Sequence, residues 1–245
     1  MAGTPPGYRE LVPFDRERHR QRGIAPDAAR FAILLGFIYL DAIEIVRAAR
    51  SLPVVFTRDA NGELVPGTQT GVEPGRNLFV DVSGDWDATA YCPAYVRRYP
   101  FYVARMPGND PERHLIYVDE AGLTAAAPAL LDASGQPTAA WEPIRSLLHD
   151  STVARAQTAA FCAGLEELDV LEEFAAEFHP YTVEPRRLGN LLRVNEDRLR
   201  ALQPAVITEL LRKGWLARIF AHLSSLENYG ALIDRYARSA TRVAH

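Results

Sequence analysis

Apolar and polar residues alternate in short runs through the first half of the chain, which predicts strands joined by turns. Pro53–Thr57 is apolar and β-branched, and the turn residues Asp59-Ala-Asn-Gly follow it almost directly. Glu63–Thr70 can therefore return as the partner strand of an antiparallel hairpin.

Turn residues punctuate the rest of the first half in the same way. Strands are predicted at residues 31–38, 77–81, 101–105 and 114–119, and a short helix at residues 40–49. The last two strands flank the sequence Pro107-Gly-Asn-Asp-Pro111, which is typical of a hairpin loop. The first half is thus predicted to consist mainly of antiparallel hairpins.

The hydrophobic period changes to that of an α-helix in the second half. The apolar residues at helical spacing are Trp141, Ile144, Leu148, Phe161, Leu165 and Leu168. Thr138 is a suitable N-cap, with Trp141 at the third helical position. A long helix is therefore predicted across this stretch.

One pair of strands is predicted inside this helical half. Residues 175–182 and 188–194 can pair over a turn at Glu184-Pro185. The predicted fold class is α+β, with a strand-rich region of antiparallel hairpins at residues 1–135 packed against a mainly helical region at residues 136–245. We expect the two regions to form one compact unit.

Further helices are predicted after this strand pair. Asn195 is expected to cap a short helix, and Pro204 to open the next one. A long amphipathic helix is predicted at residues 215–238, and its apolar face is suited to a homodimer or partner contact. His222 on this helix is expected to hydrogen-bond at the edge of the core.

Composition places the chain among soluble globular proteins. Its 245 residues are 48% hydrophobic and 24% charged, which is ordinary for a chain with a substantial core. The longest apolar run, Phe31–Leu40, is too short to span a bilayer, and the N-terminus lacks the pattern of a secretion signal. Cys92 and Cys162 lack metal-ligand spacing, so we expect reduced thiols in a cytoplasmic protein without membrane insertion.

Net charge excludes one broad class of partner. The formal charge of −4 argues against general nucleic-acid binding, because such proteins need excess basic charge to displace counterions from phosphate. No nucleic-acid partner is therefore expected.

The strongest binding candidates lie in a block of rings and guanidinium groups. The candidates are Tyr91, Tyr95, Arg97, Arg98 and Tyr99. Aromatic faces stack on planar ligand parts and Arg forks grip carboxylates, so this set suits a peptide or an aromatic acid. The alternative is structural: the rings pack the core, and the arginines pair with Asp85 or Glu120.

A catalytic or metal site is harder to place, because no Gly-x-Ser-x-Gly, Gly-x-Gly-x-x-Gly, His-Glu-x-x-His or Walker motif is present. Asp81, Asp85 and Asp87 surround Gly84, but this spacing favours a hairpin turn over a calcium loop. The weaker metal candidates are His19, Asp119 and Glu120, which the fold could bring together. No metal is expected, no cofactor can be named, and whether the protein is an enzyme stays open.

Several segments resemble the bacterial SapC family, which is named after a surface-layer locus and is distinct from the like-named peptide-transporter permease. The segments are Leu11-Val-Pro-Phe-Asp-Arg-Glu-Arg-His, residues 53–101, Tyr117-Val-Asp-Glu, Phe161-Cys-Ala-Gly-Leu-Glu-Glu-Leu, Leu171-Glu-Glu-Phe and Gly214-Trp-Leu-Ala-Arg-Ile-Phe-Ala-His-Leu-Ser-Ser-Leu-Glu-Asn. The resemblance carries over no catalytic residue. It implies a partner tailoring enzyme, halogenase-like or iron/2-oxoglutarate hydroxylase-like, since such genes often neighbour the family.

Three functional hypotheses follow. The first is an accessory or binding protein that recognises a peptide, an amino-acid-like ligand or a partner enzyme in a bacterial tailoring or uptake pathway. The alternative is an enzyme acting on an amino acid or peptide. Its site would be assembled from the dispersed residues His19, Arg97, Arg98, Asp119 and Glu120. A surface-layer role is the third hypothesis, which the missing secretion signal weakens.

Overall fold

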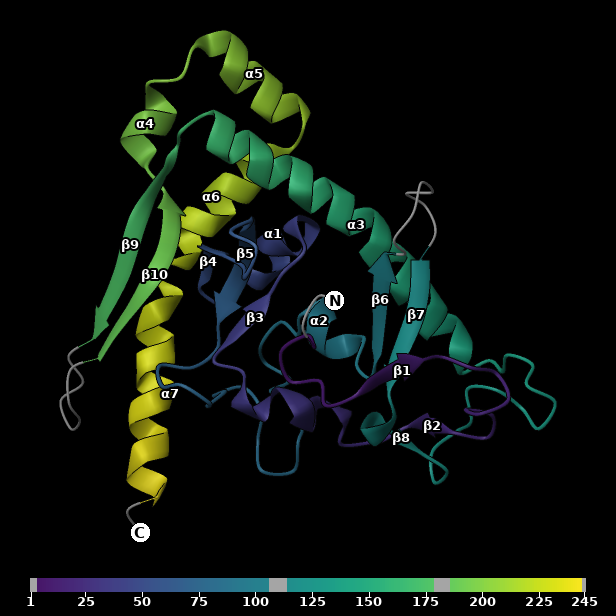
Figure 1. Ribbon diagram of the computed structural model, residues 1–245. Coiled ribbons are helices and arrows are strands. Elements are labelled where there is room, and N and C mark those ends of the chain that lie inside the picture. The colour runs from purple at the N-terminus through teal and green to yellow at the C-terminus, as the bar shows by residue number, and fades with distance from the viewer. Residues whose placement is uncertain (1–3, 106–113, 179–185, 244–245) are drawn as a thin grey trace. The chain divides into compact units, whose positions relative to one another are not determined.

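The computed structural model describes residues 4–105, 114–178 and 186–243 (Figure 1). The chain forms two compact units, each built from several segments. The first unit contains Met1–Ile33, Val80–Trp86 and Ala94–Val153, and the second contains Leu34–Phe79, Asp87–Pro93 and Ala154–His245. The long helix α3 (Trp141–Glu167) begins in the first unit and ends in the second.

The first unit is built on a small antiparallel sheet with the strand order β1-β7-β6. Its elements are β1 (Leu11–Pro13), β2 (Gly23–Ile24), η1 (Ala28–Leu34), α2 (Ala94–Arg97), β6 (Phe101–Arg105), β7 (His114–Asp119), η3 (Glu120–Gly122) and β8 (Leu123–Thr124). Strands β2 and β8 form a separate two-stranded ladder. The predicted hairpin of residues 101–105 and 114–119 is confirmed as β6 and β7, and its loop lies outside the described residues.

The core of this unit gathers apolar side chains from the sheet and from the start of α3. Phe101, Val103 and Val118 are buried together with Trp141. Phe14 stacks on the Trp141 ring with a centroid distance of 5.0 Å. Alternation along β6 and β7 therefore directs one face of the sheet onto the helix.

The second unit contains a five-stranded sheet with the order β3-β5-β4-β10-β9, in which all paired neighbours are antiparallel. Its strands are β3 (Phe37–Tyr39), β4 (Val54–Arg58), β5 (Leu64–Gln69), β9 (Leu171–Phe178) and β10 (Arg186–Val194). Strand β10 pairs with β4, so both halves of the sequence contribute to one sheet. The predicted hairpin at residues 53–70 is confirmed. The predicted pairing of residues 175–182 with 188–194 is confirmed as β9 and β10, but β9 begins earlier, at Leu171, and residues 179–182 and the turn lie outside the described residues.

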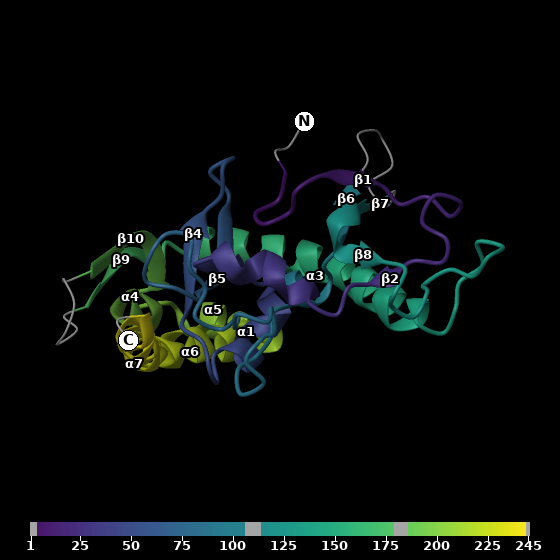
Figure 2. The same ribbon diagram turned by 90° about the horizontal axis from the view of Figure 1, so that it is seen from below.

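Helices of the second unit follow the sequence signals closely up to α6. They are η2 (Ala42–Glu44), α1 (Ile45–Ala48), α4 (Glu196–Arg200), α5 (Pro204–Arg212), α6 (Trp215–Ser225) and α7 (Asn228–Val243). Asn195 caps α4 by accepting a hydrogen bond from the Arg198 N–H at 2.9 Å, as predicted. Figure 2 shows α4, α6 and α7 on one side of strands β9 and β10.

His222 joins α6 to the strands β4 and β10. Its Nδ1–H donates to the Val54 carbonyl at 2.8 Å, and its Nε2 accepts from the Val194 N–H at 3.1 Å. Complete burial lowers the pKa of His222 to about 4, so the ring is neutral at neutral pH. The expected hydrogen bonding of this histidine at the core is confirmed.

Three predicted elements are wrong. Residues 31–38 form the 3-10 helix η1 and the short strand β3 rather than one strand. Residues 77–81 form only a bridge between Val80 and Trp86, because the side chains of Asn77 and Asp81 accept hydrogen bonds from nearby backbone N–H groups and hold turns. Residues 215–238 form two helices, and Asn228 at the break donates to the Ala49 and Leu52 carbonyls.

The apolar face of the last helix is already covered within its own unit. Tyr229, Leu232 and Tyr236 of α7 are buried, and the Tyr236 hydroxyl donates to Glu73 at 2.6 Å. This face is therefore not the free dimer surface that the sequence suggested. Among the described residues, no helix combines the length and the hydropathy that crossing a membrane requires.

Candidate functional site

Helical spacing around α2 separates the predicted binding residues into buried and exposed side chains. Tyr95, Arg98 and Tyr99 are three and four positions apart and share one side of the turn, where their exposed fractions are 5%, 9% and 6%. Arg97 points to solvent. The Arg98 N–H continues the turn by donating to the Ala94 carbonyl at 2.9 Å.

Aromatic rings from distant segments surround these side chains. The Tyr8 ring contacts Tyr95 and Tyr102 edge to face, with a centroid distance of 6.0 Å in each case. Phe31 stacks on Tyr99 at 4.1 Å. We call the set the Arg98 cluster; it consists of Tyr8, Phe31, Tyr95, Arg98, Tyr99 and Tyr102, all in the first unit. Phe31 and Tyr102 are half-buried, so the cluster reaches the protein surface.

Arg98 is a buried cation without an ion pair among the described residues. Its guanidinium carbon lies 4.9 Å from the Tyr95 ring centroid and 5.7 Å from that of Tyr102. It also hydrogen-bonds the Tyr8 side chain. Its Nε–H is buried and has no hydrogen-bond acceptor in the described structure. Burying a charge in this way is unfavourable unless an anion compensates it.

Tyr8 and Tyr99 hold their protons at neutral pH. Burial raises the pKa of Tyr8 to about 12, although the nearby Arg98 guanidinium acts in the opposite direction. Burial, reinforced by the Asp119 carboxylate, raises the pKa of Tyr99 above its usual range. Tyr8 donates its O–H to the Phe101 carbonyl at 2.9 Å, and Tyr95 donates to Pro6 at 2.6 Å. None of these groups supplies the negative charge that Arg98 lacks.

Asp119 is occupied by structural hydrogen bonds. Its carboxylate is 1% exposed and accepts from the Arg9 N–H at 2.7 Å and the Ala121 N–H at 3.2 Å. It also accepts the hydrogen bond of the Tyr99 hydroxyl. Asp119 therefore orients the Tyr99 ring and fixes the turn into η3.

His19 and Glu120 are brought together by the fold, but neither is free. His19 Nε2 lies 3.1 Å from Glu120 Oε1, and its Nδ1 lies 2.9 Å from both the backbone N–H and the carbonyl oxygen of Asp15. Because the Glu120 carboxylate can only accept, Nε2 carries a proton and donates to it. Arg18 also donates two hydrogen bonds to the Glu120 carboxylate. These hydrogen bonds are the main reason why the pKa of Glu120 is lowered. Arg18, His19 and Glu120 thus form a hydrogen-bonded network with a structural role.

Tyr91 is not part of the Arg98 cluster. It belongs to the second unit, where its hydroxyl donates to Glu44 Oε1 at 2.8 Å. Glu44 in turn accepts from the Asp41 N–H at 2.9 Å and closes the first turn of η2. This part of the predicted site thus has a local structural partner.

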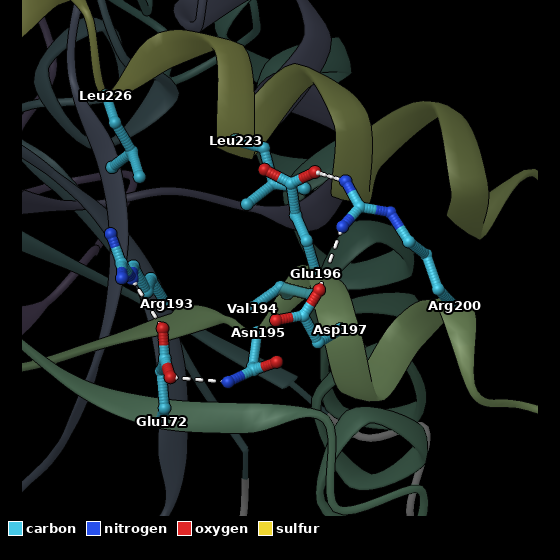
Figure 3. Close-up of a pocket in the computed structure, with 9 residues that line it drawn as sticks. All are labelled: Glu172, Arg193, Val194, Asn195, Glu196, Asp197, Arg200, Leu223 and Leu226. Carbon is cyan, nitrogen blue, oxygen red and sulfur yellow. Dashed lines mark hydrogen bonds and ion pairs between the residues drawn. The ribbon is translucent and has the colours of Figure 1, made fainter.

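A charged groove in the second unit is a further candidate (Figure 3). Its lining consists of Glu172, Arg193, Val194, Asn195, Glu196, Asp197, Arg200, Leu223 and Leu226. Figure 3 shows that its charges pair with one another: Glu172 with Arg193 at 2.7 Å, and Arg200 with Glu196 at 2.6 Å. A ligand would have to compete with these pairs, so the groove is the weaker site.

Metal binding finds no geometric basis in the described part of the chain. No group of three His, Cys, Asp or Glu side chains lies close enough there to hold a metal ion. The carboxylate of Asp81 accepts from the Ser83 and Asp85 N–H groups, so this residue acts as a turn former.

Sequence reasoning missed Tyr8, Phe31 and Tyr102. Tyr102 continues the aromatic block around residue 98, but it lies on strand β6 rather than on the helical turn. Tyr8 and Phe31 carry no local signal, because only tertiary folding brings them to the cluster. The predicted pairing of the arginines with Asp85 or Glu120 is wrong for Arg98, which has no ion pair in the described ranges.

Comparison with known families shows to which protein family the chain belongs. The SapC family model matches residues 14–232. The chain belongs to the SapC family. The match includes most of the Arg98 cluster, with Tyr8 just before its start. No curated protein and no solved structure matches this SapC chain.

Proposed function

We propose that this SapC-family protein binds a small ligand that carries a carboxylate, such as an amino acid or a peptide, at the Arg98 cluster. The buried Arg98 guanidinium carries the proposal, because it lacks an anionic partner in the described structure. A ligand carboxylate would accept the Nε–H and an adjacent Nη–H together, which matches the fork geometry of arginine.

The rings of the cluster favour a ligand with a planar or apolar part. Phe31 and Tyr102 are half-buried, so part of each ring is exposed. Their faces can stack on an aromatic side chain or a peptide plane while Arg98 holds the carboxylate. The proposed ligand is therefore an amino acid or peptide with an aromatic or apolar part, in a tailoring or uptake pathway.

Binding is favoured over catalysis by the state of the nearby ionisable groups. Tyr8 and Tyr99 have raised pKa values and hold their protons at neutral pH. Both ring nitrogens of His19 are engaged by Asp15 and Glu120. No free general base thus lies in the Arg98 cluster, and an accessory role that presents or retains a ligand fits these groups best.

The experiment compares N-acetyl amino acids with their amides by calorimetric titration. We expect the carboxylates, led by N-acetyl-tryptophan, to bind, and each amide to bind at least about tenfold more weakly. Arg98→Met should abolish this preference, and Arg98→Lys should recover it only in part because lysine lacks the fork. Arg97→Met is the matched control, since this neighbouring arginine is exposed.

Equal affinity for acid and amide across the panel would refute the proposal, as would unchanged binding by Arg98→Met. Circular dichroism of each variant separates loss of binding from loss of fold.

A further inference from the structure

The five-stranded sheet ends at β9, a strand whose outer edge no other described strand covers. In Figure 1, β9 is the outermost strand of this sheet beside β10. An open edge presents N–H and C=O groups that another extended chain can pair with. The backbone contacts of β9 show which of its residues face this edge.

Carbonyl directions alternate along β9. The Val170 carbonyl accepts from the Asn195 N–H at 2.8 Å, so it faces the β10 side of the ladder. The next carbonyl, that of Leu171, accepts from Arg198 Nη1 at 3.0 Å and faces away. Because the main-chain groups of successive strand residues point in opposite directions, Glu173, Ala175 and Glu177 also face the open edge.

The pairing register supports this alternation. The extra residue at the register shift lies in β10, between Leu188 and Leu191, so the alternation continues without interruption along β9 past Phe174 and Ala176. Leu171 is already capped by a side chain, which leaves the main-chain groups of Glu173, Ala175 and Glu177 as the open part of the edge.

A surface hollow lies beside this open part. Its volume is about 910 Å³, and it is lined by Glu173, Phe174 and Ala175 of β9 together with residues of β10 and β4. The hollow lies over β10, which contains a register shift between Leu188 and Leu191, and β9 separates it from the open edge.

Charge indicates what kind of strand would pair here. Strand β9 carries Glu172, Glu173 and Glu177 and no basic residue. Arg193 pairs with Glu172 at 2.7 Å, and Arg187 with Glu177 at 3.5 Å, whereas Glu173 is exposed and has no ion pair in the described ranges. Glu173 therefore favours a Lys or Arg side chain on an added strand, since the other two β9 carboxylates already pair with β10 arginines.

A second copy of this chain complements the edge poorly. Antiparallel self-pairing that uses all three open residues would centre on Ala175. It would place Glu173 of each copy opposite Glu177 of the other. Like charges directly opposite one another destabilise a strand pair.

We propose that the β9 edge of the second unit docks an extended, basic segment of a partner protein by strand addition. This surface is separate in sequence and unit from the Arg98 cluster, so the proposal does not depend on the ligand proposed there.

The test uses the whole protein and a blocked peptide of alternating lysine and valine with the length of β9. We expect binding by fluorescence anisotropy and new protection from amide hydrogen exchange at Glu173, Ala175 and Glu177. The matched peptide of alternating glutamate and valine should bind at least about tenfold more weakly.

Two variants locate the contact. Glu173→Lys should weaken the lysine peptide about tenfold, whereas Glu167→Lys, which reverses an exposed charge on α3, should leave its affinity unchanged. Ala175→Pro removes one open N–H and should weaken binding by a similar factor. Because exchange is measured on the unmodified protein, a variant that fails to fold leaves the test intact.

Three results would overturn the proposal. The first is unchanged protection at the open residues in saturating lysine peptide. The second is equal binding of the glutamate peptide. The third is a concentration-dependent dimer in sedimentation that protects the same amides, which would assign the edge to a second copy.

Discussion

The Arg98 guanidinium carbon lies 4.9 Å from the Tyr95 ring centroid, yet its buried Nε–H has no acceptor in the described structure. Rings compensate a cation only in part, because their quadrupole is weaker than a full negative charge. A ligand anion would thus stabilise the buried charge of Arg98. In the free protein this charge lowers the stability of the fold.

The first prediction follows from that cost. Arg98→Met removes a buried charge while keeping an extended apolar side chain. We expect the free energy of unfolding to rise by about 1–3 kcal/mol while carboxylate binding is lost. Urea denaturation of the ligand-free protein measures the change. A destabilisation of similar size would show that Arg98 serves the fold.

A second prediction concerns the hydrogen bond between Tyr99 and Asp119. Tyr99→Phe leaves a buried carboxylate, 1% exposed, with one donor fewer, and should cost about 1–3 kcal/mol. Tyr95→Phe is the control, since its hydroxyl donates to the Pro6 carbonyl in the N-terminal segment. Chemical denaturation should show the larger loss for Tyr99→Phe, and the opposite order would contradict the assignment of Asp119.

The third prediction is a pH dependence that originates in His222. Its pKa is about 4 in the folded protein, against an ordinary value of 6.5, so the unfolded chain binds more protons between these limits. Stability from this residue is therefore complete above pH 6.5 and is lost as the pH falls toward 4, by about 3 kcal/mol in total.

His222→Gln is the variant that isolates this contribution, because glutamine can hydrogen-bond but does not titrate. Its unfolding free energy should vary less steeply than that of the parent protein between pH 6.5 and 5. Parallel curves for the two proteins would mean that other groups cause the dependence.

A fourth prediction compares two helical glycines. A Cβ at Gly164 in α3 would clash with the Trp215 ring, whereas a Cβ at Gly230 in α7 would meet nothing within 4 Å. Gly164→Ala should destabilise by about 1–3 kcal/mol despite its better helix propensity, and Gly230→Ala should stabilise by about 0.5–1 kcal/mol. Thermal melts of the pair provide the measurement; a stabilised Gly164→Ala would show that Trp215 can move aside.

Local signals in the sequence were sufficient for most of the fold. The hairpin of β4 and β5 follows from the apolar, β-branched run before the turn residues Asp59-Ala-Asn-Gly, and α4 follows from its Asn195 cap. The residues that determine each of these elements lie within a few positions of one another in the sequence. Residues 31–38 were harder, because a continuous apolar run fits a buried strand and a buried helical turn equally well.

The candidate site was predicted only in part for a related physical reason. Tyr95, Arg98 and Tyr99 are neighbours in sequence, and their helical spacing makes them one surface. Tyr8 and Phe31 reach the same surface by tertiary packing, which no local pattern encodes. Burial of Arg98 without a carboxylate partner likewise depends on the whole unit.

The most direct test of the central claim is an NMR measurement of the Arg98 Nε–H in the whole protein. On addition of N-acetyl-tryptophan, we predict a downfield shift of this resonance and slower exchange with water, as a new carboxylate acceptor requires. N-acetyl-tryptophan amide should leave the resonance in place. No shift with any N-acetyl amino acid, or the same shift with acid and amide, would contradict the assignment of Arg98 as the carboxylate-binding residue.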